Sequence, residues 1–415
     1  MRFENFDLHI RKEGDLYVAH VTDSPAGASQ REVLRWPIGD AAERLSVLEN
    51  AVRESQERPP SSDIFLSPPE KILREFGADV YRTVFVESGS VAFSYRSSLD
   101  MVGSKVDTGL RLNLRIEPPE MAMLPWEYVC DATGKSDNYL CLRNTKRVSP
   151  IVRDLGENRR APNIPIDGPV RVLAMIANPG GGWPGLDTEK ERRLLVQILG
   201  DRVTWVARAT RDGLYEAMQQ GPWHIFHFIG HGGTDRSVND DGTVNSEGFL
   251  VMDDGLGHPV KVSATRLGEI LEDGKISLAV LNCCESARGN ASSSVGSALV
   301  ASAVPMAIAM QFPITNASAS RFSDQFYKSL REGKTVESAL TQARKNIRNG
   351  SDAEWGIPVL FTRVDSCVLF KEPSPAEKAA AVTAEQAPAG SANVKVPAPE
   401  RTKAQIEMGL LWPRS

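Results

Sequence analysis

Two apolar runs of the sequence end on side chains that can do covalent chemistry. The run over residues 225–229 leads to His231, and the run over residues 276–281 leads to Cys283 and Cys284. Short apolar runs are typical of buried strands, and in a parallel sheet both ends lie along one carboxyl edge, where open α/β folds bind their ligands. The sequence therefore predicts a site with a cysteine nucleophile and a histidine base.

Acyl transfer also needs N–H donors where the oxyanion develops, and the sequence supplies them next to both side chains. Gly232 and Gly233 follow His231, and glycines let the backbone approach a ligand closely. We therefore predict that the N–H groups of Gly232 and Cys284 form the oxyanion hole. A lone cysteine or histidine is most often an ordinary core or turn residue. Here both end a core strand, which favours function.

The other histidines of the first run are poor metal ligands. His224 and His227 point to opposite faces of a regular strand and cannot chelate one ion. A zinc site made of His227, His231, Cys283 and Cys284 is a weaker alternative, because adjacent cysteines also point apart. We predict neither a metal nor a cofactor.

Two further segments are candidates for contact with substrate. The loop of residues 180–183, Gly-Gly-Gly-Trp, lacks the Gly-Lys-Ser/Thr of a phosphate loop, which favours a flexible loop on the substrate side. Asp235 lies four residues after His231, and its carboxylate is a candidate for lining a pocket that accepts a basic residue. A solvated surface charge is the competing interpretation of Asp235.

Composition excludes several classes of protein. The 415 residues carry 48 basic and 53 acidic side chains, and no basic run is long enough to follow a nucleic-acid backbone. No apolar stretch reaches the roughly 20 residues of a membrane span, and the first residues lack a secretory signal. The five cysteines suit free thiols better than a disulfide framework. We expect a soluble, cytoplasmic protein with no direct contact to nucleic acid or membrane.

The pattern of elements predicts an α/β fold. From residue 169 onward, strands alternate with helices, as in a mostly parallel sheet with helices on both faces. We predict an N-terminal β-rich region over residues 1–60, an α+β accessory region over 61–165, the main domain over 166–371, and a disordered tail over 372–415. The tail ends in a small apolar segment, residues 406–412, which is either a frayed terminus or a docking peptide.

Several blocks of the sequence resemble the CHAT domain, a caspase-like peptidase family related to caspases and separases. They are His227-Phe228-Ile229-Gly230-His231-Gly232, the segment from Val280 to Gly289 around the two cysteines, the segment from Val304 to Pro313, and Trp355-Gly356-Ile357-Pro358-Val359-Leu360-Phe361. Leu124-Pro125-Trp126-Glu127 resembles the region that often precedes the domain in bacterial members.

The resemblance implies a caspase-like fold and a cysteine endopeptidase that cleaves particular proteins through a thioester. It assigns the nucleophile to Cys284 and the base and acid to His231, with Cys283 where the family usually has alanine. It places Asn282 in the primary specificity pocket. It also implies an activating protein partner in trans and a role in bacterial antiviral defence or programmed cell death. The alternatives are a catalytically inactive adaptor or scaffold and a non-proteolytic cysteine hydrolase.

Overall fold

The computed structural model describes residues 2–35, 40–58, 66–131, 139–142, 149–155, 166, 168–238, 244–283, 286, 294–366 and 368–370. Cys284 and Glu285, the segment 287–293, Cys367 and the predicted tail, residues 372–415, lie outside the described residues.

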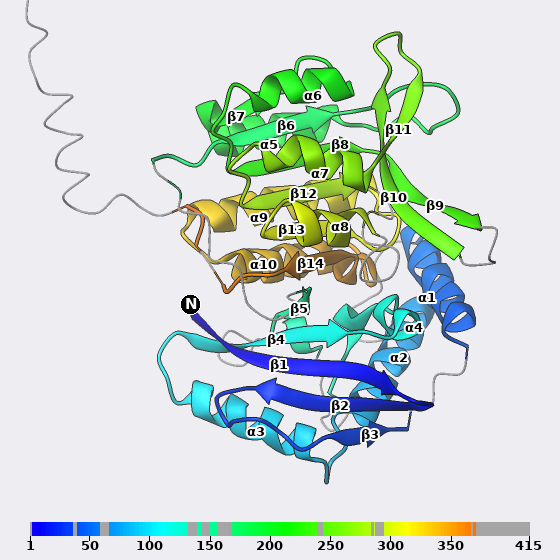
Figure 1. Cartoon of the computed structure of the whole chain (residues 1–415), viewed down its shortest axis with the longest axis vertical. Helices are drawn as coiled ribbons and strands as arrows, with labels where there is room; N and C mark the ends of the chain where they lie inside the picture. The colour runs from blue at the N-terminus through cyan, green and yellow to red at the C-terminus, as the bar shows by residue number, and fades with distance from the viewer. Residues whose placement is uncertain are drawn as a thin grey trace, which may run out of the picture. The chain divides into compact units, whose positions relative to one another are not determined.

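A single sheet carries both strand ends discussed above. Its strands are β1 (Arg2–Glu13), β2 (Leu16–Asp23), β3 (Glu32–Leu34), β4 (Thr108–Ile116), β5 (Ile151–Asp154), β6 (Val172–Ile176), β7 (Val203–Trp205), β8 (Ile225–Gly230), β12 (Leu278–Cys283), β13 (Met306–Met310) and β14 (Pro358–Thr362). Among the described residues these eleven strands lie in the order β3-β2-β1-β4-β5-β14-β13-β12-β8-β6-β7 (Figure 1). β2 pairs antiparallel with β1 and β3, and β14 with β13, whereas the other neighbours pair parallel.

Helices cover both faces of this sheet. They are α1 (Ala41–Gln56), α2 (Pro68–Val84), α3 (Ser90–Gly103), α4 (Pro119–Ala122), α5 (Glu189–Leu199), α6 (Arg211–Met218), α7 (Ala264–Glu272), α8 (Val295–Ser302), α9 (Asn316–Arg331) and α10 (Val336–Arg348), with the 3-10 turns η1 (Trp126–Tyr128), η2 (Leu140–Leu142), η3 (Gly200–Arg202) and η4 (Glu354–Gly356). The predicted α/β class, with a mostly parallel sheet and helices on both faces, is confirmed.

Strand alternation divides the core into two clusters. Along β8, Phe226 and Phe228 pack with apolar residues of α6, α7 and α8. Ile225 and Ile229 point the other way and pack with residues of α5, α9 and α10. Successive side chains of a strand leave opposite faces of its sheet, so each continuous apolar run serves both clusters.

The helices that follow β7 begin where the sequence supplies a cap. Thr210, Ser263, Ser294, Thr315 and Thr335 precede α6, α7, α8, α9 and α10, and each side chain accepts a hydrogen bond from an N–H of the first turn. Such caps satisfy N–H groups that have no partner within the helix. They fix where each crossover helix starts and therefore how the chain returns to the sheet.

A second, smaller sheet leaves the main one at His231. Its strands β9 (Gly232–Val238), β10 (Val244–Asp253) and β11 (Pro259–Ser263) are antiparallel and lie in the order β11-β10-β9. The chain enters β9 directly after the end of β8. This arrangement attaches a three-stranded sheet to the carboxyl edge of the main sheet (Figure 1).

The N-terminal strands belong to the same sheet as the later βα units. β1 pairs parallel with β4, β4 with β5, and β5 with β14. Residues 1–60 also contain α1, a helix that the sequence analysis did not predict, in which Leu45, Leu48 and Val52 are buried and Asp40 caps the first turn. The domain boundaries near residues 60 and 165 stay predictions.

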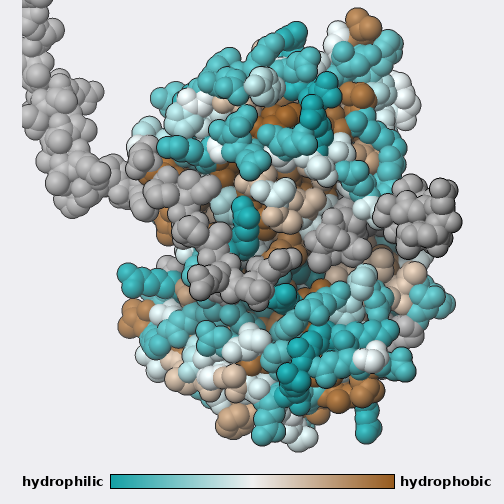
Figure 2. Space-filling model, viewed as in Figure 1, coloured by the Kyte–Doolittle hydropathy of each residue, from teal (hydrophilic) through white to brown (hydrophobic). Residues whose placement is uncertain are grey.

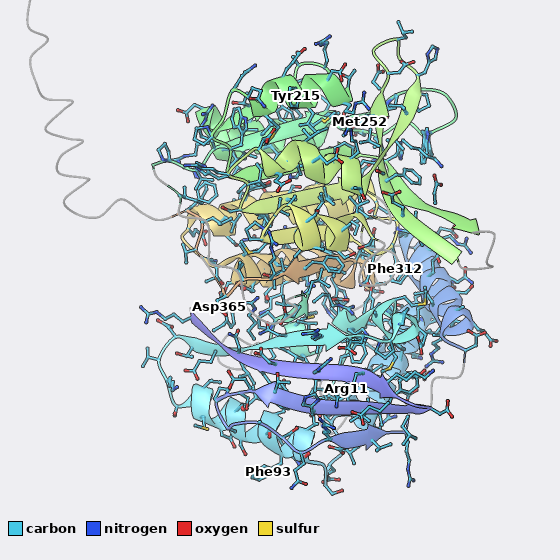
Figure 3. All side chains as sticks on the ribbon, in the orientation of Figure 1. Arg11, Phe93, Tyr215, Met252, Phe312 and Asp365 are labelled. Carbon is cyan, nitrogen blue, oxygen red and sulfur yellow. The ribbon has the colours of Figure 1, made fainter. Side chains whose placement is uncertain are left out.

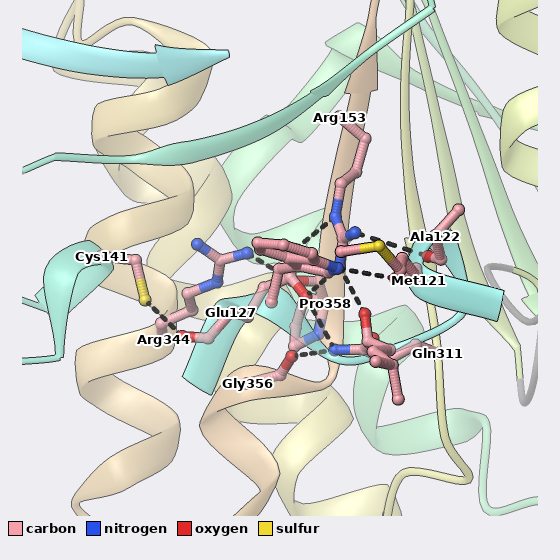
Figure 4. Close-up of polar contacts among 11 residues, drawn as sticks. Met121, Ala122, Glu127, Cys141, Arg153, Gln311, Arg344, Gly356 and Pro358 are labelled. Atoms are coloured by element: carbon pink, nitrogen blue, oxygen red, sulfur yellow. Dashed lines mark hydrogen bonds and ion pairs between the residues drawn. The ribbon is translucent and has the colours of Figure 1, made fainter. Parts of the chain in front are cut away.

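A buried polar cluster joins the N-terminal region to the later strands (Figure 4). Glu127, in η1 after Pro125, accepts hydrogen bonds from Arg153 Nη2 at 2.9 Å and from Gln311 Nε2 at 3.0 Å. Gln311 Nε2 also donates to the carbonyl of Gly356 at 2.7 Å. The segment Leu124–Glu127 thus leads into a 3-10 turn whose glutamate binds Arg153 of β5 and Gln311, just beyond β13.

Hydrophilic side chains cover most of the face shown in Figure 2. Two aromatic side chains, Phe93 on α3 and Tyr215 on α6, have exposed fractions of 69% and 51%, and they lie near opposite ends of the view in Figure 3. In the part of the chain that the structure describes, no helix has both the length and the apolar character needed to cross a membrane.

Candidate active site

His231 is the first residue after β8 and is fixed by its backbone. Its carbonyl accepts a hydrogen bond from the N–H of Val251 in β10 at 2.9 Å, and its side chain is buried. Gly230, just before it, is required by packing, because a Cβ there would lie 2.8 Å from the carbonyl oxygen of Ala177. The histidine therefore sits on rigid backbone at the edge of the main sheet.

The imidazole of His231 contacts the loop that follows β6. Its Nε2 lies 2.8 Å from the carbonyl oxygen of Pro184. A carbonyl can only accept, so Nε2 carries the proton in this contact, and in the neutral ring Nδ1 keeps the lone pair that a general base needs. The ring centroids of Trp183 and His231 lie 5.1 Å apart, and the two ring planes meet at 33°. The Gly-Gly-Gly-Trp loop thus lies beside His231, and its contact with substrate stays a prediction.

Cys283 ends β12 beside the end of β8. The parallel register pairs Leu281 with Phe228 and Cys283 with Gly230. The side chain of Cys283 is 2% exposed and packs in the apolar cluster under α6, α7 and α8. The described thiol at this strand end therefore points into the core. Cys284, the predicted nucleophile, is the next residue of the chain.

The first residues of the small sheet hold the other predicted site residues. Gly232, a predicted oxyanion donor, is the first residue of β9 and pairs with Leu250. Asp235 lies further along β9 with an exposed side chain, and both of its carboxylate oxygens accept hydrogen bonds from Lys261 Nζ, at 2.7 and 2.9 Å. A substrate role for Asp235 stays a prediction, and its ion pair with Lys261 gives the carboxylate a partner within the chain.

Asn282, the predicted pocket residue, points to the opposite face from Cys283. Its side-chain amide donates to Glu191 Oε1 on α5 at 2.6 Å, and the residue is 5% exposed. His227 lies on the same face, with its Nε2 3.4 Å from the same oxygen. A substrate role for Asn282 stays a prediction.

His224 and His227 occupy separate environments, as strand alternation predicts. His224 Nδ1 accepts a hydrogen bond from the N–H of Arg171 at 2.9 Å, whereas the Nδ1 of His227 lies 2.9 Å from the hydroxyl of Tyr327. Among the described residues, no group of three or more histidine, cysteine or acidic side chains is arranged to hold a metal ion.

A cavity of about 580 Å³ lies elsewhere on the sheet, where β4 and β5 face α7 and α8. Its lining includes Ile116, Leu155 and Phe361, with Glu117 and Glu269 among its polar groups. Neither His231 nor Asn282 belongs to it. We therefore place the candidate site at the strand ends and not in this cavity.

Two contacts of the site were missing from the sequence analysis. Pro184 contributes only a carbonyl, which carries no side-chain signal. Glu191 did leave a signal, because it lies on the stripe of α5 that buries Leu195, Ile198 and Leu199. A charged residue at a position of helical core spacing indicates a buried polar partner.

Comparison with known proteins gives a family. A model of the CHAT domain family matches residues 99–388, well over half of the chain. The comparison with curated proteins found no match.

Among solved structures, the chain is similar to the separase–securin complex of Saccharomyces cerevisiae, with 10% identity over 86% of this chain and 30% of that chain and a TM-score of 0.49. It is also similar to the complex of the pro- and mature domains of RgpB from Porphyromonas gingivalis, with 11% identity over 80% of this chain and 79% of that chain and a TM-score of 0.40. The chain spans less than a third of the separase chain that it matches.

Proposed function

The chain belongs to the CHAT domain family, and from this premise we propose that it is a cysteine endopeptidase in which Cys284 is the nucleophile and His231 the general base and acid. The observation that carries the proposal is the register of the two strands. Cys283 at the end of β12 pairs with Gly230 at the end of β8, and the chain continues from them to Cys284 and to His231. The register brings these two strand ends together, which supports a pairing of the thiol with the imidazole.

Strand parity supports the choice of Cys284 over its neighbour. Cys283 shares the face of Leu281 and is buried in the apolar cluster. Asn282, one position earlier, faces α5 together with His227. Asn282 and His227 thus face Glu191 on the same side of the sheet, and we propose that the thiol of Cys284 acts with His231 from this side.

The proposed reaction follows from these positions. The thiol proton of Cys284 passes to Nδ1 of His231, and the sulfur attacks the scissile carbonyl carbon. The N–H groups of Gly232 and Cys284 hold the oxyanion, and the C–N bond breaks as His231 returns the proton to the leaving amine. Water, deprotonated by His231, then attacks the thioester, which releases the acid and restores the thiol.

We also propose that a protein partner in trans activates the enzyme. Losing one oxyanion donor costs about 10² to 10³ in rate, so a small displacement of either strand end is enough to silence the site. The family resemblance supports a specific protein as substrate and a cytoplasmic setting in bacterial antiviral defence or programmed cell death.

The test is cleavage of candidate proteins co-expressed with the chain. We expect the wild type and Cys283→Ala to give the same new fragments, and Cys284→Ala and His231→Ala to give none. Cleavage by Cys284→Ala at the wild-type rate would overturn the proposal. Loss of cleavage in Cys283→Ala alone would transfer the nucleophile to the other thiol.

A further inference from the structure

A cluster of buried polar side chains lies near the ends of β8 and β12, on the face of the sheet covered by α5 and α9. We call it the Glu191 cluster; it consists of Glu191, His227, Asn282, Ser323 and Tyr327. Glu191 Oε1 accepts hydrogen bonds from Asn282 Nδ2 at 2.6 Å and from Ser323 Oγ at 2.5 Å, and it lies 3.4 Å from His227 Nε2. All five side chains are at least nine-tenths buried.

Tyr327 joins the cluster through His227. Burial, together with the charge of Glu191, holds the pKa of Tyr327 well above its ordinary value. The phenol oxygen lies 2.9 Å from His227 Nδ1, and the tautomer of the ring decides which of the two donates. Asn282 and Ser323 both donate to the carboxylate of Glu191.

These contacts link β8 and β12 to α5, the helix that follows the Pro184 loop. Asn282 is the second residue before Cys284 on β12, and His227 is the fourth before His231 on β8. Glu191 itself lies in the first turn of α5, shortly after Pro184, whose carbonyl binds His231 Nε2. One carboxylate therefore joins both strand ends to the loop that orients the imidazole.

The chemistry of the position argues against a purely packing role. The core stripe of α5 is otherwise apolar, and a leucine at position 191 would extend it. Burying a carboxylate carries a large desolvation penalty that hydrogen-bond donors only partly offset. Because an apolar residue would pack there without that penalty, the carboxylate is expected to serve the site above it.

We propose that Glu191 is a positioning residue that holds the ends of β8 and β12 in the arrangement the dyad needs. The inference rests on the proposed function and deepens it. Removing the negative charge and one acceptor lets the strand ends and the Pro184 loop shift relative to one another. A displacement of about 1 Å at a catalytic pair costs about 10²-fold in rate.

The test uses the full chain and a readout that needs no substrate. The rate at which iodoacetamide alkylates Cys284 is measured as a function of pH. Peptide mass spectrometry distinguishes Cys284 from the other cysteines. The variants are Glu191→Gln, His231→Ala and, as a matched control, Glu354→Gln. Glu354 is equally buried and accepts from Thr315 and Ser318, but it touches neither strand end.

In the wild type we expect Cys284 to react with an apparent pKa below the ordinary value of about 8.5, because the neighbouring imidazole stabilises its thiolate. Glu191→Gln should slow the reaction at pH 7 about tenfold and raise the apparent pKa towards that of a free thiol. Glu354→Gln should leave the pH profile unchanged even where it lowers the melting temperature.

The outcomes separate the two claims. A wild-type profile like that of an ordinary thiol, unchanged in His231→Ala, would overturn the proposed function itself. A depressed wild-type pKa that His231→Ala abolishes but Glu191→Gln leaves intact would overturn only the role of Glu191.

If Glu191→Gln fails to fold, Ser323→Ala serves as the second variant, because it removes one donor to Glu191 from outside the site. The inference then requires a shift of the Cys284 profile in the same direction, and a profile identical to the wild type would contradict it.

Discussion

Cys283, the last residue of β12, directly precedes the proposed nucleophile Cys284 in the sequence. Cys283 is buried among apolar side chains on one face of β12, whereas Asn282 before it points to the other face, towards α5. A nucleophile must be reached by a substrate carbonyl, and a thiol inside a packed core cannot be. At the residue scale, the proposed chemistry therefore depends on which face each thiol occupies.

Cys283→Ala should keep the cleavage activity within about twofold of the wild type. It should lower the free energy of unfolding by about 1 kcal/mol, because it removes a small buried group. Urea unfolding and a cleavage assay on the same preparation measure both effects. A variant that stays equally stable but loses activity would give Cys283 a part in the reaction.

Cys141 offers a pH-dependent prediction away from the site. Burial raises the pKa of its thiol to about 11. The thiol of Cys141 loses its proton near pH 9 in the unfolded chain but keeps it there in the folded chain. The contribution of this thiol to the free energy of unfolding is therefore complete below pH 8 and is lost as pH rises through 11. At pH 10 the loss is about 1 kcal/mol.

The measurement for Cys141 is urea unfolding of the wild type and of Cys141→Ala at pH 8 and pH 10. The variant should lose less stability between these two pH values than the wild type. An equal loss in both proteins would show that the thiol does not titrate as its burial requires.

Residue patterns predicted the ends of the two strands but not their surroundings. An apolar run followed by His231, or by Cys283 and Cys284, can be recognised in the sequence alone. The contact with the carbonyl of Pro184 is not, because any residue supplies a carbonyl and only the folded loop selects which one meets the ring. Glu191 was predictable from its place on the buried stripe of α5.

At the scale of elements, buried side chains tie the turns between strands to the sheet. In η1, Glu127 binds Arg153 of β5 through two hydrogen bonds, at 3.1 and 2.9 Å. Gln311, just beyond β13, binds the same carboxylate. This cluster connects the N-terminal strands to β13 and β14.

Arg153→Met should lower the free energy of unfolding by about 3 kcal/mol, because it leaves the buried Glu127 without its counter-charge. The matched control is Lys261→Met, which breaks the exposed ion pair with Asp235 and should cost less than about 1 kcal/mol. Chemical unfolding of both variants gives the comparison. Equal effects would mean that the Glu127 cluster adds no more than a surface pair.

The alternation of strands and helices after residue 169 was predictable, whereas the helix α1 in the N-terminal region was not predicted. Short apolar runs indicate the strands of the βα units, and Met306–Met310, which forms β13, is one such run. The helix α1 was missed because the region was interpreted from its first strands. Its spacing of Leu45, Leu48 and Val52 is helical, and Asp40 is an N-cap residue.

At the scale of the molecule, one sheet contains strands from both sides of the boundaries that we predict near residues 60 and 165. β1 and β4 extend the sheet beyond β5 and β14, so the accessory region and the βα units share hydrogen-bonded strands. Strand order between segments a hundred residues apart leaves no local signal in the sequence. For this reason the fold class could be predicted and the extent of the sheet could not.

The shared sheet predicts that residues 2–370 unfold as one cooperative unit. Hydrogen exchange in increasing urea should give the same transition midpoint for peptides covering β4 and for peptides covering β12. An earlier transition of the β1–β4 peptides would show that the N-terminal region is a separate domain, as the predicted boundary near residue 165 implies.

The central claim is that Cys284 and His231 form one reactive pair, and covalent capture tests it most directly. The full chain, alone and co-expressed with candidate partner proteins, is treated with a mixture of peptidyl acyloxymethyl ketones that differ in the residue before the reactive carbonyl. The adduct is located by peptide mass spectrometry. We predict an adduct on Cys284 that persists in Cys283→Ala and is lost in His231→Ala. An adduct on Cys283, or one on Cys284 that forms at the wild-type rate without His231, would contradict the account.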